Sequence, residues 1–146
     1  LARDGVLSVS PSLIDPPLSR ASSLPQELGG QVGGGVEHVY DLYGPSEDTT
    51  YSTWTRRTPG GTANIGRPLK HTASYLLDAN LQPVPQGVSA ELYLSGAGIT
   101  RGYLGRAAMT AEKYVPNPFS TTGERLYRTG DLCRYRADGV LEYQGR

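Results

Sequence analysis

The sequence has 146 residues, and its 14 Lys and Arg residues balance its 14 Asp and Glu residues, so charge gives no reason to expect nucleic acid or an anionic membrane as a partner. The length is enough for one domain, and a hydrophobic share of 37% is compatible with a folded core. The 19 glycines and 11 prolines predict many turns and short elements, which excludes a long helical bundle.

The first third of the chain is the least regular part. A brief helix is predicted over residues 24–32, with Ser23 as its cap. A buried strand is expected over residues 36–42, and it ends at a turn formed by Gly44 and Pro45. Because this strand has no predicted neighbour in a sheet, its apolar edge is expected to promote association of the chain.

From residue 58 onward the pattern changes to short strands separated by turn residues. Strands are predicted over residues 74–78 and 90–94, and alternation places three apolar side chains of the second strand on one face: Ala90, Leu92 and Leu94.

Two further elements are predicted downstream of these strands. Residues 99–104 are expected to continue as a strand after a glycine turn. A short helix is predicted over residues 110–115, with Thr110 as its cap and Pro116 as its end.

The end of the chain carries the strongest local signal, a hairpin of residues 132–136 and 140–143 joined by Asp138 and Gly139. Alternation places Cys133 and Tyr135 opposite Arg134 and Arg136, so one face is expected to be exposed to solvent. The single cysteine excludes an internal disulfide, suits a reducing compartment such as the cytoplasm, and is interpreted as a small buried apolar residue.

The segment from Tyr43 to Glu47 has the chemistry of a nucleotide site at the end of a strand. An aromatic ring stacks on a base, a glycine admits a close backbone approach, and the Ser46 hydroxyl suits a phosphate oxygen. The Glu47 carboxylate is the hard oxygen ligand that magnesium prefers. Read alone, however, these residues also fit an ordinary surface turn.

Asp131 is the second candidate, at the end of a predicted loop over residues 127–132. A carboxylate there is able to accept two hydrogen bonds from a ribose diol. The alternative is an Asp and a Gly that simply form a turn.

Taken in order and with their spacing, several segments resemble the adenylation domains of nonribosomal peptide synthetases, within the acyl-adenylate-forming, AMP-binding superfamily. The segments that carry this resemblance are residues 41–47, 65–69, 90–104, 110–119, 127–132 and 141–146. The resemblance implies a mixed α/β fold that is mostly β. Residues 1–57 would be the end of an α/β subdomain, and residues 58–146 a small distorted β-barrel subdomain.

The resemblance also implies a reaction. The carboxylate of an amino acid attacks the α-phosphate of ATP, which gives an aminoacyl-adenylate and pyrophosphate, and a phosphopantetheine thiol on a peptidyl carrier domain then takes the acyl group. Mg²⁺ would assist, and a condensation domain would be a further partner. Chemistry of this kind depends on positioning and charge neutralisation.

Residue roles follow from the same resemblance. Around the adenosine, Tyr43 would stack on adenine, Asp41 would accept from its exocyclic amine, Asp131 would hold the ribose hydroxyls, and Arg146 would reach the ribose and the neighbouring phosphate. Ser46 stands beside the phosphate, and Glu47 matches the magnesium-binding, catalytic glutamate. The residues that would line the amino-acid pocket are Leu42, Thr50 and Tyr51.

The resemblance also shows what this sequence lacks. The family's upstream phosphate loop, its pocket aspartate and the C-terminal domain with the catalytic lysine are absent, so the isolated chain is expected to be inactive. Two alternatives stay open at this point: a non-catalytic binding or scaffold module derived from such a domain, and a ligase that forms coenzyme A thioesters.

Overall fold

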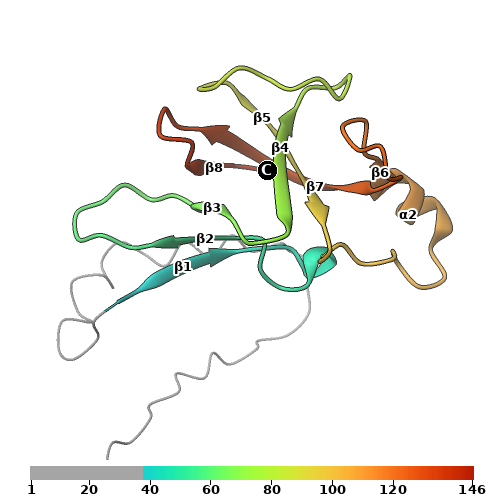
Figure 1. Ribbon diagram of the computed structural model, residues 1–146, viewed down its shortest axis with the longest axis horizontal. Coiled ribbons are helices and arrows are strands. Elements are labelled where there is room, and N and C mark those ends of the chain that lie inside the picture. Colours follow the sequence, from blue (N-terminus) through green and yellow to red (C-terminus); the bar gives the residue numbers. More distant parts are fainter. Residues whose placement is uncertain (1–37) are drawn as a thin grey trace, which may run out of the picture.

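The computed structural model describes residues 38–146, which form two antiparallel sheets with little helix (Figure 1). The first sheet has the strand order β1-β2-β3, and the second has the order β4-β5-β7-β6, with β8 paired to β7. The strands are β1 (Tyr40–Tyr43), β2 (Thr53–Arg56), β3 (Arg67–Pro68), β4 (Thr72–Leu77), β5 (Ser89–Gly96), β6 (Tyr114–Pro116), β7 (Arg125–Tyr135) and β8 (Leu141–Gly145).

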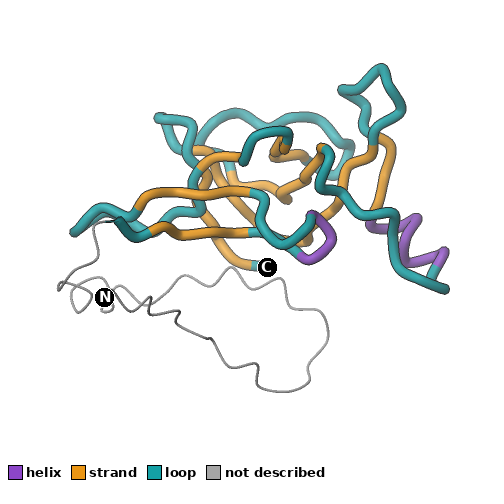
Figure 2. Tube along the Cα trace, turned by 60° about the horizontal axis from the view of Figure 1, so that its bottom comes forward, coloured by secondary structure: helices purple, strands orange, loops and turns teal. Residues whose placement is uncertain are grey.

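The described helices are the 3-10 helix η1 (Ser46–Asp48) and α2 (Ala107–Lys113). Both lie toward the same end of the molecule (Figure 2). No helix within residues 38–146 has the length and apolar character needed to cross a membrane.

Strand β1 presents two different faces. Its inner residue Tyr43 lies opposite Thr53 of β2, and both are buried. On the outer face Leu42 lies opposite Trp54, and these side chains are 40% and 42% exposed. The period-2 alternation of a strand therefore gives this sheet one core face and one apolar face that stays exposed.

The turn between β1 and β2 is tight, and Gly44 makes it possible. A Cβ at this position would lie 2.5 Å from the Thr50 carbonyl oxygen, so no larger residue fits without a shift of the backbone. The Ser52 amide closes the turn by donating to the Tyr43 carbonyl at 2.7 Å. This bond holds the segment that carries η1 against the end of β1.

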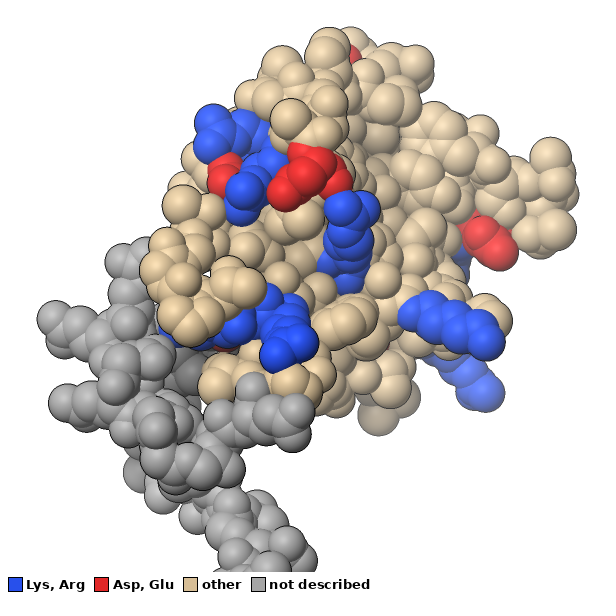
Figure 3. All heavy atoms as spheres, turned by 60° about the vertical axis from the view of Figure 1, so that its left-hand side comes forward, with Lys and Arg blue, Asp and Glu red and all other residues tan. Residues whose placement is uncertain are grey.

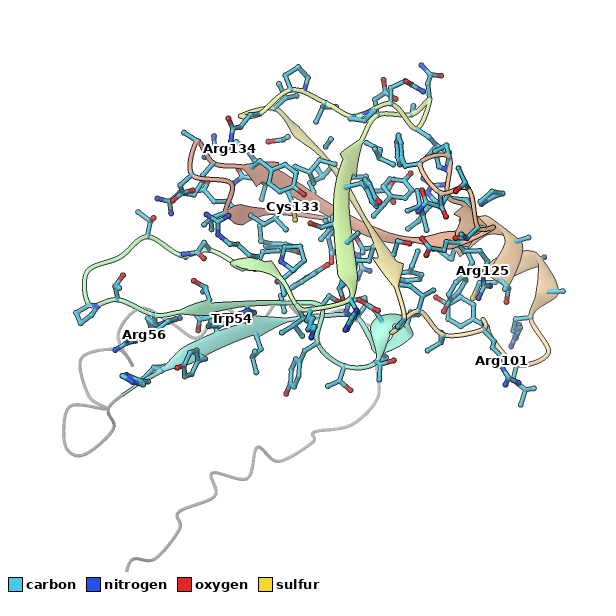
Figure 4. All side chains as sticks on the ribbon, in the orientation of Figure 1. Trp54, Arg56, Arg101, Arg125, Cys133 and Arg134 are labelled. Carbon is cyan, nitrogen blue, oxygen red and sulfur yellow. The ribbon has the colours of Figure 1, made fainter. Side chains whose placement is uncertain are left out.

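The two sheets share one apolar core. Leu92 and Leu94 of β5 and Leu141 of β8 are 0% exposed, and Tyr43 of β1 and Ile65 of the loop before β3 pack into the same cluster. Cys133 lies inside this core (Figure 4), where burial raises the pKa of its thiol to about 12. Its interpretation as a small buried residue is consistent with this setting.

The outer side of the β7–β8 hairpin carries both basic and acidic side chains. Arg134 and Arg136 pair with Glu142, and Arg136 also pairs with Asp138. On the face shown in Figure 3, basic and acidic side chains likewise lie next to each other.

The mostly-β mixed fold expected from the sequence is confirmed. The strands expected over residues 74–78 and 90–94 correspond to β4 and β5, and the hairpin at the end corresponds to β7 and β8. Only the end of the strand expected over 36–42 is found as a strand, β1, and it pairs with β2, so the expectation that it lacks a sheet neighbour was wrong. The helix expected over 24–32 lies outside the described residues. The division at residues 57 and 58 stays a prediction.

Three local expectations were wrong. Residues 99–104 form a loop and not a strand. The helix α2 starts three residues before Thr110, whose hydroxyl accepts from the Tyr103 amide instead of capping a helix. Residues 127–132 are not a loop but the interior of β7. The Thr-Gly-Asp sequence that reads as a turn instead forms a bulge, because Glu91 pairs with Leu132 whereas Tyr93 pairs with Arg128.

Candidate nucleotide-facing site

The bulge in β7 sets the direction of Asp131, the residue expected to hold ribose. The Gly130 amide donates to Glu91 Oε1 at 3.2 Å, and the Thr129 hydroxyl donates to the Leu92 carbonyl at 2.7 Å. The Asp131 amide in turn donates to Thr129 Oγ1 at 3.0 Å. Side chains thus satisfy the backbone groups that the bulge removes from the ladder, which fixes this aspartate in place.

Tyr43 meets Asp131 across 88 residues of sequence. Its hydroxyl donates to Asp131 Oδ2 at 2.7 Å, and the two residues are 1% and 0% exposed. Burial, followed by the charge of Asp131, raises the pKa of the Tyr43 phenol far above its ordinary value. The phenol therefore stays protonated and acts as a donor to the carboxylate.

Arg146 completes this cluster from the end of β8. Its Nε lies 3.4 Å from Asp131 Oδ1, and its Nη2 donates to the Thr129 carbonyl at 3.1 Å. The Arg146 side chain is 41% exposed, so it covers the buried carboxylate from the solvent side. Three of the residues expected around adenosine therefore lie together.

The same geometry limits what Tyr43 presents to a ligand. With 1% of its surface exposed, the Tyr43 ring is covered on both faces in this conformation. Stacking on adenine thus stays a prediction, and it requires displacement of the atoms that cover the ring.

Asp41 precedes Tyr43 by two residues and points to the same face of β1. Its carboxylate receives Nε and Nη2 of Arg57 at distances of 2.9 to 3.0 Å. The two side chains are largely buried, with 16% and 18% of their surfaces exposed. Asp41, which is expected to accept from adenine, is therefore already bound by the bidentate Arg57 guanidinium. Its contact with adenine stays a prediction.

Ser46 and Glu47 lie on η1, within the turn between β1 and β2. Ser46 is exposed, and Glu47 accepts a hydrogen bond from the Tyr103 hydroxyl to Oε1 at 2.6 Å. Burial and then this hydrogen bond raise the pKa of Tyr103 to about 12. Tyr127 of β7 lies next to this pair, with its hydroxyl 3.5 Å from that of Tyr103.

Glu47 has the right chemistry for a magnesium ion bound to phosphates. Protein magnesium sites commonly supply one or two carboxylates and leave the other positions to phosphate and water. Within residues 38–146, no group of three or more His, Cys, Asp or Glu side chains is placed to hold a metal ion. Glu47 therefore suits a magnesium ion whose other ligands are phosphate and water, and not a metal site built entirely from protein side chains.

The three expected pocket residues lie apart from the Tyr43 cluster. Leu42 is on the opposite face of β1 from Tyr43, and Tyr51, in the turn, is 50% exposed. Thr50 is exposed too, with a positive φ of 81°. Their role in lining an amino-acid pocket stays a prediction.

Sequence reasoning did not identify two partners of the candidate residues, Tyr103 and Arg57. Tyr103 lies in a segment quoted for the family resemblance, yet nothing local connects it with Glu47, which is 56 positions away in sequence. Arg57 follows Arg56, and only the pairing of β1 with β2 brings it to Asp41.

Comparisons with known proteins agree with this picture. A family model described as AMP-binding enzyme matches residues 15–104. The chain is 58% identical over 116 residues to a linear gramicidin synthase protein of Brevibacillus parabrevis, a match that covers 77% of this chain and 2% of that protein. It is 51% identical over 109 residues to Phosphinothricin tripeptide synthetase PhsB of Streptomyces viridochromogenes, covering 74% of this chain and 9% of that protein.

Solved structures give the same result. Holo-AB3403, a four-domain nonribosomal peptide synthetase bound to AMP and glycine, matches with a TM-score of 0.77 and 35% identity over 85% of this chain and 9% of that one. PA1221, which contains adenylation and PCP domains, matches with a TM-score of 0.69 and 34% identity over 75% of this chain and 23% of that one. The chain thus spans only a small part of the proteins it matches.

Proposed function

Because the chain belongs to the AMP-binding enzyme family and corresponds to part of a nonribosomal peptide synthetase adenylation domain, we propose that it forms the nucleotide-facing portion of an amino-acid-activating ligase. In this reaction an amino-acid carboxylate oxygen bonds to the α-phosphorus of ATP. The bond between the α-phosphorus and the oxygen that bridges it to the β-phosphorus breaks, and pyrophosphate leaves with the electron pair. The thiol sulfur of a carrier's phosphopantetheine then bonds to the acyl carbon and gives up its proton. The bond from that carbon to the phosphate oxygen breaks, and AMP leaves with the electron pair.

The observation that carries this proposal is the contact of Tyr43, Asp131 and Arg146. A phenol, a carboxylate and a guanidinium from β1, β7 and the end of β8 meet at 2.7 and 3.4 Å. In the proposal Asp131 accepts from the ribose diol, and Arg146 turns from the carboxylate toward the ribose and phosphate. Asp41 and Tyr43 contact the adenine.

The phosphate end of the site lies on the turn after β1. Ser46 donates its hydroxyl to a phosphate oxygen, and Glu47 holds the magnesium ion that accompanies ATP. The ion neutralises charge on the phosphates when it is bound. Leu42, Thr50 and Tyr51 contribute to the choice of amino acid.

The partners proposed for the whole protein are a peptidyl carrier domain and a condensation domain. The multidomain synthetases that the chain resembles support this, and one similar solved structure contains adenylation and PCP domains. On its own, this 146-residue chain is proposed to be inactive.

The test is amino-acid-dependent pyrophosphate exchange by the full-length protein, screened over a panel of amino acids. We expect exchange with one or a few of them, and Asp131→Asn is expected to raise the KM for ATP. No exchange with any amino acid would overturn the proposal and favour a scaffold module. Transfer to coenzyme A in preference to a carrier domain would instead indicate the coenzyme A ligase branch.

A further inference from the structure

The contact between Tyr103 and Glu47 has the geometry of a support for a metal ligand. The Tyr103 hydroxyl donates to Glu47 Oε1 at 2.6 Å, and an ionised acceptor makes such a bond shorter and stronger than a neutral one. The residues are 56 positions apart and come from different segments, η1 and the loop after β5. Chain connectivity alone therefore does not explain why they meet.

The loop that carries Tyr103 is itself held on several sides. The Tyr103 amide donates to Thr110 Oγ1 of α2 at 2.9 Å, and the Tyr103 ring contacts the Tyr114 ring edge-on with centroids 5.7 Å apart. Gly102, with a φ of 139°, brings the loop so near α2 that a Cβ there would lie 2.3 Å from Thr110 Cγ2. The phenol is therefore presented from a fixed backbone.

The same loop also holds the backbone of η1. The Thr100 amide donates to the Glu47 carbonyl at 2.9 Å, and the Thr49 hydroxyl donates to the Gly98 carbonyl. Figure 1 shows this segment running from beside η1 to α2, and Arg101 marks its outer side in Figure 4. The loop thus holds Glu47 at its backbone and, through Tyr103, at one carboxylate oxygen, and the Tyr127 phenol of β7 lies beside the same carboxylate.

We propose that Tyr103 is a positioning residue that orients the Glu47 carboxylate toward the magnesium ion of ATP. This inference rests on the proposed function. A carboxylate has about four lone-pair sites, so one phenol leaves others for a metal. Magnesium demands near-ideal octahedral geometry, and a glutamate that is free to rotate meets this demand less often. Groups that orient a metal ligand typically change metal affinity or activity by about 10- to 100-fold when they are removed.

Tyr114 provides a matched control for Tyr103. It belongs to the same aromatic cluster and contacts the Tyr103 ring, but its hydroxyl bonds to Thr100 at 2.6 Å and not to Glu47. Tyr103→Phe and Tyr114→Phe each remove one hydroxyl from this cluster. Only the first removes a partner of the proposed ligand.

The experiment uses the full-length protein and measures the Mg²⁺ dependence of amino-acid-dependent pyrophosphate exchange. Tyr103→Phe is expected to raise the half-saturating Mg²⁺ concentration about tenfold, with the maximal rate at saturating Mg²⁺ retained within a few-fold. Tyr114→Phe is expected to change neither quantity by as much as about twofold. A Tyr103→Phe protein with unchanged Mg²⁺ dependence, or equal effects of both variants, would overturn the inference.

A second readout does not depend on activity. Free Mn²⁺ is measured by electron paramagnetic resonance in the presence of α,β-methylene-ATP, and Tyr103→Phe is expected to weaken Mn²⁺ binding about tenfold. In a Glu47→Gln background the same substitution is expected to have no further effect. Additive losses in that background would show a merely structural role and refute the positioning.

The two readouts separate failure of the inference from failure of the proposed function. Absence of exchange by the unsubstituted protein defeats the proposed function, whereas Mn²⁺ affinities still test Tyr103. Unsubstituted protein that binds no Mn²⁺ with the analogue defeats the inference. If Tyr103→Phe does not fold, Thr110→Val, which removes the hydroxyl that accepts from the Tyr103 amide, is expected to shift Mn²⁺ affinity in the same direction by a smaller factor.

Discussion

The two sheets differ in how far their apolar side chains are exposed to solvent. In the five-stranded sheet Leu92, Leu94 and Leu126 are 0% exposed. In the three-stranded sheet Leu42 and Trp54 on the outer face are 40% and 42% exposed. The first group is fully buried, whereas the second is partly exposed. The five-stranded sheet is therefore buried more completely, whereas the three-stranded sheet contributes Tyr43 to the core and leaves its outer face partly exposed.

The candidate site lies where these two regions meet. Tyr43 belongs to β1 of the three-stranded sheet, but its ring is part of the core built on the five-stranded sheet. Its hydroxyl reaches Asp131 in the bulge of β7. Ligand-facing chemistry thus rests on the well-packed side of β1, while the other side of the same strand stays apolar and exposed.

The largest expected effect comes from truncating one leucine on each side of this comparison. Leu92→Ala is expected to lower the free energy of unfolding by about 2–5 kcal/mol, because the fully buried site keeps a cavity. Leu42→Ala is expected to change it by about 0.5 kcal/mol or less. Urea unfolding followed by circular dichroism measures both. Similar losses for the two variants would show that the outer face of β1 is as well packed as the core.

Within β1 itself, Tyr43 and Tyr40 form a second matched pair. Tyr43→Phe leaves the buried Asp131 carboxylate without one donor, which is expected to cost about 1–3 kcal/mol in the free energy of unfolding. Tyr40 is 47% exposed and packs against Trp54, so Tyr40→Phe is expected to be nearly neutral. Equal stabilities of the two variants in urea would argue against a strong Tyr43 to Asp131 bond.

The buried carboxyl of Asp48, at the end of η1, lowers the free energy of unfolding. It is 1% exposed, and burial raises the pKa of its carboxyl, an effect that the neighbouring Ser52 hydroxyl opposes only in part. Asp48→Asn removes the buried charge and is expected to raise the free energy of unfolding at neutral pH by about 1 kcal/mol.

The sign of the pH dependence follows from the raised pKa. The native state holds the Asp48 proton more tightly than the unfolded state, so this carboxyl favours folding at low pH and loses that effect as pH rises through its native pKa. The advantage of Asp48→Asn should therefore shrink as the pH is lowered. Urea melts across a pH series measure it, and a constant or growing advantage toward acid would contradict this account.

Local pattern was sufficient for elements whose partners lie nearby. The alternation of Ala90, Leu92 and Leu94 identified one buried face of β5, although Tyr93 and Ser95 on its other face are buried as well. Asp138 with Gly139 identified the final hairpin. It was not sufficient for β7. Gly130 was interpreted as part of a loop or turn, and the glutamate that supports the bulged amide is 39 positions away. Support from a distant side chain leaves no local signature.

The candidate site shows the same division. Tyr43, Asp131 and Arg146 were assigned to one ligand through the family resemblance, and the structure brings them together. Their direct contacts, and the pairing of Asp41 with Arg57, could not be predicted. Both depend on which strand lies beside which, and that is decided by packing over long sequence separations.

A substitution on the outer face of the three-stranded sheet is expected to change stability least and association of the chain most. Tyr40, Leu42 and Trp54 form the exposed apolar face of the three-stranded sheet, in which β1 is an edge strand among the described residues. Trp54→Lys is expected to leave the free energy of unfolding within about 0.5 kcal/mol, yet to reduce self-association of the chain. Size-exclusion chromatography with light scattering over a concentration series measures this.

Leu104 is the matched control for that experiment, because it is fully exposed but lies on the loop before α2, away from the three-stranded sheet. Leu104→Lys adds the same charge and removes a comparable apolar side chain, so a general solubility effect would act on both variants alike. We expect association to persist in Leu104→Lys and to fall in Trp54→Lys. A chain that is monomeric without substitution, or one rescued equally at both positions, would show that this sheet face does not drive association.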